Sequence, residues 1–228
     1  MTRDLIVFDM DGVLVDVSDS YRESIVQTVK RFTGHEVSRS AIQGYKNSGG
    51  WNNDWALSQR IIQDFGVQVE YERVVEVFNA IFLGGTDGAE GLVSRERWIA
   101  VPGTLENLSK RFDFAIFTGR LRMEVDITLR RFASGYRFDP IVTAEDTAQP
   151  KPAPDGLRHI ADRFPNRKIW YVGDTVDDAQ SAHSAGIAFI GIAAPGSPRQ
   201  DELDRILRSE GAITVLGDIN RLESVLPR

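Results

Sequence analysis

The chain has 228 residues, of which 42% are hydrophobic and 26% charged, a composition typical of soluble globular proteins. This length suits one large domain or one domain that carries an insertion. The net charge is −6, and no basic arm or Lys/Arg cluster indicates a nucleic acid or an anionic membrane as a partner. The absence of cysteine excludes disulfides, thiolate catalysis and cysteine-based metal sites.

No apolar run approaches the roughly 20 residues that a membrane span requires. The N-terminal stretch "MTRDLIVFDMDG" has an apolar core too short for a signal peptide, and acidic residues interrupt it. We therefore expect a cytoplasmic protein with no membrane partner. Nothing in the sequence indicates an oligomeric state.

Five short apolar runs are typical of strands in a sheet that is covered on both faces. A sixth run, Ala212–Leu216, is a weaker candidate strand. Helical patterns separate the later runs, and alternating strands and helices predict a parallel α/β sheet with right-handed crossovers. The five predicted strands are Leu5–Phe8, Phe114–Thr118, Ile141–Ala144, Ile169–Gly173 and Ile187–Ile192. The predicted helices of this part are Thr104–Arg111, Met123–Phe132, Asp155–Phe164 and Asp177–Ala185.

The segment after the first strand breaks this alternation. Ser20–Phe32 and Val74–Leu83 carry apolar residues at helical spacing, and no convincing strand lies between them. We predict an α/β core formed by residues 1–15 and 92–228, with an all-helical insertion at residues 16–91. The glycine-rich return "GGTDGAEG" is compatible with a hinge or with a plain flexible linker.

Two acidic residues follow the first predicted strand in "DLIVFDMDGVLVD". Residues i and i+2 of an extended chain project to the same side, so Asp9 and Asp11 can face one centre. Gly12 then allows a sharp turn of the backbone. Because a buried charge is costly without a partner, this placement indicates that a cation meets these acids.

A second acidic group, "GDTVDD", follows the run Ile169–Gly173 and supplies Asp174, Asp177 and Asp178. Carboxylates that gather at neighbouring strand ends repel one another unless a cation lies between them. Oxygen ligands alone suit a hard divalent ion, and we expect Mg²⁺. For Asp177 a role in the site and a position favoured by the helix dipole are equally compatible with the sequence.

Groups that bind an anion occur at the same edge of the predicted sheet. Thr118 offers a hydroxyl and Gly119 an approachable backbone N–H, while Lys151 lies in a proline-stiffened segment. Together with the acidic residues and one metal ion, these groups describe a site for a phosphoryl group.

Four motifs appear in the order of the haloacid dehalogenase superfamily, which the chain resembles: "DMDGVLVD", "FTGR", "KPAPD" and "GDTVDD". In this family the core is a Rossmann-like sheet, and the insertion resembles the helical cap of the first cap class. The resemblance implies an aspartate-nucleophile phosphatase that acts on a small-molecule phosphate ester. Dehalogenases lack the second acid, so Asp11 favours phosphate chemistry.

The resemblance implies a role for each matching residue. Asp9 would be the nucleophile, and Asp11 would protonate the leaving oxygen and then activate water. Asp9, Asp174 and the backbone carbonyl of Asp11 would hold Mg²⁺. Thr118, with the Gly119 N–H, would bind phosphoryl oxygens, Lys151 would neutralise charge beside Asp9, and Asp178 would steady Lys151 or a metal-bound water.

Specificity is expected in the helical insertion, especially in "YKNSGGWNNDWAL". The candidates for substrate contact are Arg22, Lys46, Asn47 and Asn52. In the alternative interpretation, Trp51 and Trp55 have helical i, i+4 spacing and pack inside the insertion at a helix–loop–helix corner. Arg120 lies close to Thr118 in the sequence, and we expect it, like Arg22, either to contact the leaving group or to point into solvent.

Two other functions remain open. A sugar phosphomutase of the same family would keep Asp11 and retain the phosphoryl group in its product. A non-enzymatic phospho-acceptor domain also combines Asp, Mg²⁺, Thr and Lys, but the motif order argues against it. Histidinol phosphate, phosphoglycolate and sugar phosphates are all open as substrates.

Overall fold

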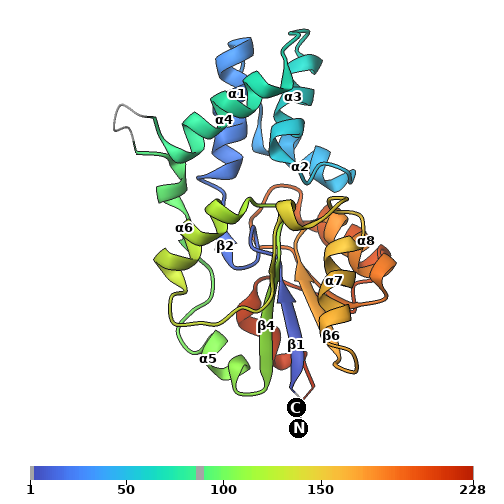
Figure 1. The fold of residues 1–228 in the computed structure, drawn as a ribbon. Coiled ribbons are helices and arrows are strands. Elements are labelled where there is room, and N and C mark those ends of the chain that lie inside the picture. Colours follow the sequence, from blue (N-terminus) through green and yellow to red (C-terminus); the bar gives the residue numbers. More distant parts are fainter. Residues whose placement is uncertain (1–2, 86–89, 228) are drawn as a thin grey trace. The chain divides into compact units, whose positions relative to one another are not determined.

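The computed structural model describes residues 3–85 and 90–227, and Figure 1 shows its fold. The chain divides into two compact units, one of residues 1–15 and 98–228 and the other of residues 16–97. The segment Gly84–Gly91, for which a hinge and a plain linker were both left open, falls partly on residues 86–89, which lie outside the described residues. Within the described part, no helix combines the length and the apolar character needed to cross a membrane.

The first unit contains a six-stranded sheet in the order β5-β4-β1-β6-β7-β8. Every pair of neighbouring strands in it is parallel. The strands are β1 (Asp4–Phe8), β4 (Phe112–Phe117), β5 (Ile141–Val142), β6 (Ile169–Gly173), β7 (Ala188–Ile192) and β8 (Thr214–Leu216). The predicted parallel α/β sheet is therefore confirmed, including its sixth strand.

Strand β1 lies in the middle of the sheet, between β4 and β6 (Figure 1). Val7 is paired with Ala115 of β4 on one side and with Tyr171 of β6 on the other. Leu5 and Val7 face one side of the sheet and Ile6 and Phe8 the other, because successive side chains alternate along a strand. All four are fully buried, which explains why the run is apolar without interruption.

Helices cover both faces of this sheet. Helices α7 and α8 lie on one side of it and α5 and α6 on the other (Figure 1). The core of the first face combines strand residues such as Leu5, Val7 and Tyr171 with Leu157 of α7 and Ala179 of α8. The helices of this unit are α5 (Thr104–Ser109), α6 (Arg122–Phe132), α7 (Asp155–Arg163), α8 (Val176–Ala185) and α9 (Gln200–Ser209). Short 3₁₀ turns span Ala144–Asp146 and Ile219–Ser224.

The second unit is helical, with α1 (Tyr21–Thr33), α2 (Arg39–Asn47), α3 (Asp54–Asp64) and α4 (Tyr71–Leu83). Its core is built from apolar residues at helical spacing, such as Ile25 and Val29 of α1 and Val74 and Phe78 of α4. A 3₁₀ turn, η1 (Leu92–Arg95), packs against α1 and α4. These contacts place residues 92–97 with the helical unit, whereas the sequence analysis placed that boundary after residue 91.

The two connections between the units pair with each other. Strand β2 (Val15–Asp16) and strand β3 (Arg97–Trp98) form a separate two-stranded sheet. An ion pair between Arg97 and Asp16, with Nη2 2.8 Å from Oδ2, joins the two connections. Such two-residue strands carry no periodic pattern, and the sequence analysis did not predict them.

Candidate active site

The site lies at the carboxyl ends of β1, β4 and β6, where open parallel sheets bind ligands. Asp9 directly follows β1, and its backbone N–H donates to the carbonyl of Val172 at 2.8 Å. Thr118 directly follows β4, and its N–H donates to the carbonyl of Val142 at 3.0 Å. The sheet ladder thus continues one residue beyond each strand and fixes both residues at this edge.

Lys151 connects the first and fourth motifs. Its Nζ lies 2.9 Å from Oδ1 of Asp9 and 2.7 Å from Oδ1 of Asp178. The Lys151 side chain is 1% exposed, and its ammonium lies over the rings of Phe117 and Tyr171. Burial alone would lower the pKa of Lys151, but the charges of Asp178 and Asp9 raise it above its usual value. The lysine is therefore a fixed cation beside Asp9.

Asp178 is held from several sides. Its Oδ1 accepts a hydrogen bond of 2.5 Å from the hydroxyl of Tyr171. Its Oδ2 accepts from the N–H of Asp174, and from both the N–H and the hydroxyl of Thr175. Thr175 is the N-cap of α8 and in turn accepts from the N–H of Asp178. Although burial opposes it, the charge of Lys151 and these donors lower the pKa of Asp178. Asp178 is thus an ionised anchor for Lys151.

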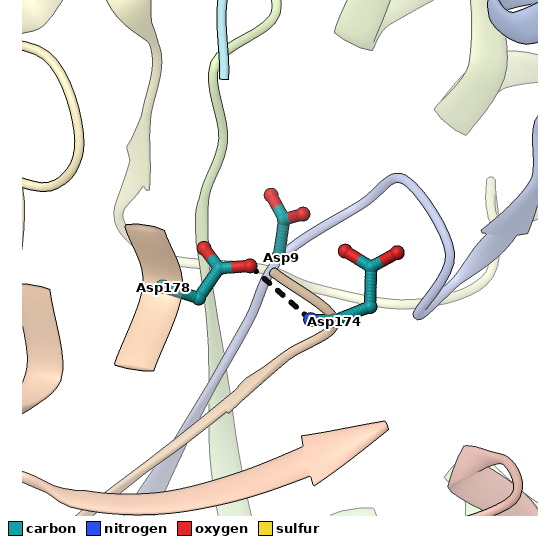
Figure 2. Close-up of side chains that lie close together, drawn as sticks. All are labelled: Asp9, Asp174 and Asp178. Atoms are coloured by element: carbon teal, nitrogen blue, oxygen red, sulfur yellow. Dashed lines mark hydrogen bonds between the residues drawn. The ribbon is translucent and has the colours of Figure 1, made fainter. Parts of the chain in front are cut away.

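Asp174 completes a cluster with Asp9 and Asp178, shown in Figure 2. One carboxylate oxygen from each of the three lies within 4.8 Å of the others. Gly12 makes room for this cluster, because a Cβ there would lie 2.0 Å from Oδ2 of Asp174. The φ angle of Gly12 is 70°, a left-handed conformation that favours glycine and confirms the expected sharp turn.

The charge of the cluster fits a bound cation. Three carboxylates, from Asp9, Asp174 and Asp178, meet one ammonium group, that of Lys151. Burial raises the pKa of Asp9 to about 7, and the nearby charges of Asp178 and Asp11 add to this rise while Lys151 opposes it. A hard divalent ion bound by the carboxylate oxygens would offset the repulsion between these buried negative charges. Asp9 and Asp174 are the residues that would hold it, because the oxygens of Asp178 already accept from Lys151, Tyr171 and Thr175.

Thr118 and Gly119 directly follow β4, the strand that pairs with β1. Thr118 is 2% exposed, and its hydroxyl accepts a hydrogen bond of 3.2 Å from the N–H of Arg120. Gly119 is exposed between two buried neighbours, which leaves its backbone open to a ligand. Asp177 is 2% exposed in the first turn of α8, a position that the helix dipole favours.

Arg120 does not point into solvent, contrary to one of the two positions that the sequence left open for it. Its side chain is 1% exposed, and its Nη2 lies 2.6 Å from Oδ1 of Asp11. A guanidinium is costly to bury without partners, and Asp11 supplies one. This contact could not be predicted from the sequence, because 109 positions separate the two residues.

In the helical unit, Arg22 and Lys46 converge on Asp54. Lys46 is 7% exposed, and its Nζ lies 2.5 Å from Oδ1 of Asp54. Arg22 approaches the same oxygen at 3.8 Å. Asn47 is 5% exposed and its Oδ1 accepts from Gln43, while Asn52 is partly buried in the loop before α3. Two cations around one carboxylate leave this cluster with an excess of positive charge.

The two tryptophans of the helical unit do not share a helix. Trp51 lies in the loop between α2 and α3 and packs edge-on against Tyr45. Trp55 lies in the first turn of α3, where it contacts Phe78 and donates from Nε1 to Asn79. The expected helix–loop–helix corner is present, but α3 begins only at Asp54, so the i, i+4 helical relationship predicted for the two residues is wrong.

Three residues of these clusters were not identified from the sequence as site residues. Tyr171 lies in the buried strand β6, where its hydroxyl is the only polar side-chain group in "IWYV" apart from the indole N–H of Trp170. The hydroxyl of a tyrosine in such a run needs a buried hydrogen-bond partner, and this requirement could have indicated that Tyr171 belongs to the site. Arg120 and Asp54 gave no comparable signal, because their partners are set by the tertiary fold.

Residues 6–192 match the sequence model of a family described as haloacid dehalogenase-like hydrolase. Among curated proteins, the chain is 30% identical to an imidazoleglycerol-phosphate dehydratase of Phytophthora nicotianae, over 92% of this chain and 49% of that protein. The chain therefore spans about half the length of this relative. It is 25% identical to a phosphoglycolate phosphatase of Haemophilus influenzae, over 82% of this chain and 84% of the relative.

The fold is also found in solved structures. A haloacid dehalogenase-like protein of unknown function from Agrobacterium tumefaciens superposes with a TM-score of 0.73. The two chains are 21% identical, and the match covers 98% of this chain and 97% of the other. At this identity the likeness establishes the fold alone.

Proposed function

Because this chain belongs to the haloacid dehalogenase-like hydrolase family, we propose that it is a magnesium-dependent phosphatase of small-molecule phosphate monoesters. Its phosphatase-named relative, which is matched over most of both chains, supports this class of reaction. The observation that carries the proposal is the buried contact of 2.9 Å between Lys151 Nζ and Asp9 Oδ1 at the end of β1. A carboxylate held there beside a fixed cation is suited to attack a dianionic phosphoryl group.

The reaction has two halves. In the first, a carboxylate oxygen of Asp9 forms a bond to phosphorus while the bond from phosphorus to the ester oxygen breaks, and Asp11 gives its proton to that oxygen. In the second, Asp11 takes a proton from water, whose oxygen bonds to phosphorus as the Asp9–phosphorus bond breaks. Asp11 thus serves first as general acid and then as general base, a contribution of about 10²–10⁴-fold.

The other residues bind and orient the phosphoryl group. Lys151 and the N–H of Gly119 meet its oxygens, and Thr118 contributes its hydroxyl. Asp178 and Tyr171 hold Lys151 in place. Asp9, Asp174 and the backbone carbonyl of Asp11 would hold Mg²⁺, whose positive charge would lower the repulsion between the phosphoryl group and the carboxylates.

The test is phosphate release from a panel of monoesters, with Mg²⁺ and with a chelator, by the wild type and by Asp9→Asn. The panel contains phosphoglycolate, sugar phosphates, histidinol phosphate and imidazoleglycerol phosphate, the last because of the name of one relative. We expect release that requires both Mg²⁺ and Asp9. Retained activity in Asp9→Asn, with contamination excluded, would contradict the assignment of the nucleophile.

A phosphomutase would give a different result with the same panel. Inorganic phosphate would not accumulate, and a sugar phosphate would be converted to its isomer once a sugar bisphosphate is added. The isomer is detected by chromatography of the same reaction mixtures. This outcome would replace the phosphatase proposal while leaving Asp9 as the phosphoryl acceptor.

A further inference from the structure

Arg120 holds Asp11 through a fork of two nitrogen atoms. Nε of Arg120 donates to Oδ1 of Asp11 at 2.7 Å, and Nη2 lies 2.6 Å from the same oxygen. The third nitrogen, Nη1, donates to the hydroxyl of Thr128 on α6 at 2.7 Å. The guanidinium therefore connects the loop after β1 to a buried position on α6.

The two partners differ in exposure. The Arg120 side chain is 1% exposed and that of Asp11 29%, so the arginine is the fixed member of the pair. Thr128 is fully buried and adds a second anchor to the guanidinium. A planar guanidinium with all three nitrogens in use has little freedom to rotate. Asp11, by contrast, lies in a turn and is partly open to solvent.

The backbone of Arg120 is fixed as well. Its N–H donates to the Thr118 hydroxyl at 3.2 Å, and its carbonyl accepts from the N–H of Ala144 at 3.1 Å. These bonds tie Arg120 to the ends of β4 and β5. The loop that contains Thr118 and Gly119 therefore also contains Arg120, the residue that holds Asp11.

Both contacts of Arg120 with the Asp11 carboxylate go to Oδ1. Among residues 3–85 and 90–227, the structure records no hydrogen bond to Oδ2. A carboxylate that transfers a proton needs one oxygen free to contact the reacting group. The orientation of the carboxylate decides whether that oxygen lies within reach of the group. Arg120 leaves this oxygen available while it fixes the other.

We propose that Arg120 is a positioning residue that orients Asp11 for proton transfer through Oδ2. This inference rests on the proposed phosphatase function and extends it to a residue outside the phosphoryl-binding groups. Arg120 itself gives and takes no proton. Oδ2 of Asp11 gives its proton to the ester oxygen as the ester bond to phosphorus breaks, and later takes one from the attacking water.

The experiment compares two esters that differ in their need for an acid. The leaving oxygen of p-nitrophenyl phosphate is stable as an anion near neutral pH, whereas that of an alkyl phosphate must be protonated. The value of kcat/KM reports the first half-reaction, so it isolates the step in which Asp11 acts as acid. The variants are Arg120→Met, Arg120→Lys and Thr128→Val, and Asp11→Asn is the reference.

We expect Arg120→Met to lower kcat/KM for the alkyl ester by about tenfold to a hundredfold, within the range that a general acid supplies. For p-nitrophenyl phosphate the loss in kcat/KM is expected to be several times smaller. Arg120→Lys, which keeps the charge, and Thr128→Val, which keeps the Asp11 contact, should show weaker losses in the same direction. Arg130→Met is the control, because Arg130 lies on α6, the helix of Thr128, and its side chain is 83% exposed.

A second comparison uses Asp11→Asn as the background. If Arg120 acts through Asp11, adding Arg120→Met to Asp11→Asn causes no further selective loss on the alkyl ester. Equal losses on both esters, or a full further loss in the Asp11→Asn background, would overturn the positioning role. Thermal unfolding shows which variants are folded, and Arg120→Lys carries the test if Arg120→Met does not fold. Failure of the phosphatase proposal is separate, because it would appear as activity retained in Asp9→Asn.

Discussion

Gly12 and Asp174 approach so closely that a Cβ atom at position 12 would lie 2.0 Å from Oδ2 of the aspartate. The contact joins the turn after β1 to the end of β6, the two places where the acidic residues of the site converge. Gly12 thus has a steric requirement in addition to its φ of 70°.

We therefore predict that Gly12→Ala displaces Asp174 and lowers phosphate release at least about tenfold, since displacements of about 1 Å cost about 10²-fold. Gly34→Ala is the matched control, because Gly34 has a φ of 75° and no heavy atom within 4 Å of the added Cβ. It carries the left-handed strain without the clash. Equal activity losses in both variants would contradict the steric explanation.

Gly173 likewise leaves room for Asp178, because a side chain at position 173 would clash with it. A Cβ at Gly173 would lie 2.5 Å from Cβ of Asp178, in a fully packed part of the sheet edge. We expect Gly173→Ala to lower the free energy of unfolding by about 1–3 kcal/mol, the usual cost of overpacking. Urea denaturation measures this change. Gly135→Ala, with nothing within 4 Å of the new Cβ, should leave the midpoint unchanged.

The hydroxyl of Tyr171 donates to Asp178 at 2.5 Å inside the core. Tyr171→Phe removes one donor to a buried carboxylate and keeps the ring beneath Lys151. We predict a loss of about 1.5–3 kcal/mol in the free energy of unfolding, as for a hydrogen bond to a charged group. Chemical denaturation at neutral pH measures it. Tyr71→Phe, which loses only an exposed contact to Asn53, should be close to wild type, and an equal loss there would refute the prediction.

Asp9 makes the metal-free protein sensitive to pH. Burial raises the pKa of Asp9 from 3.8 to about 7, so between these values the folded state keeps a proton that the unfolded state has lost. The contribution of Asp9 to the free energy of unfolding is therefore complete at low pH and is lost as pH rises through about 7.

The check compares the wild type with Asp9→Asn in a chelator at pH 5 and at pH 8. The asparagine variant lacks this titration, so the wild type should lose stability relative to it as the pH rises. Adding Mg²⁺ at pH 8 should restore wild-type stability and have less effect on the variant. A difference in unfolding free energy that is independent of pH would show that Asp9 is ionised throughout.

The sheet was predictable because its strands are apolar on both faces. Runs such as Ile169–Gly173 stand out from the helical patterns around them, and polar residues directly follow three of these runs. Helix α9 and the short strands β2 and β3 were missed. The helix lies in a polar sequence with two buried leucines, Leu203 and Leu207, and the strands have two residues each.

The candidate site was predictable to the extent that its residues follow strands directly. Asp9, Thr118 and Asp174 each come after a strand, and parallel strands bring such residues to one edge. The direction of the Arg120 side chain could not be predicted in this way. Its local sequence allowed two directions for its side chain, and only packing against α6 and the turn at Asp11 selects the buried one.

The central claim is that Asp9 carries the phosphoryl group during turnover. The most direct measurement is rapid quenching during steady state, reduction with borohydride and mass spectrometry of the tryptic peptide Asp4–Arg22. Borohydride reduces an aspartyl phosphate to homoserine, so we predict homoserine at position 9 only when substrate and Mg²⁺ are both present. Turnover in which this peptide keeps an unmodified Asp9, or in which another residue is reduced, would contradict the account.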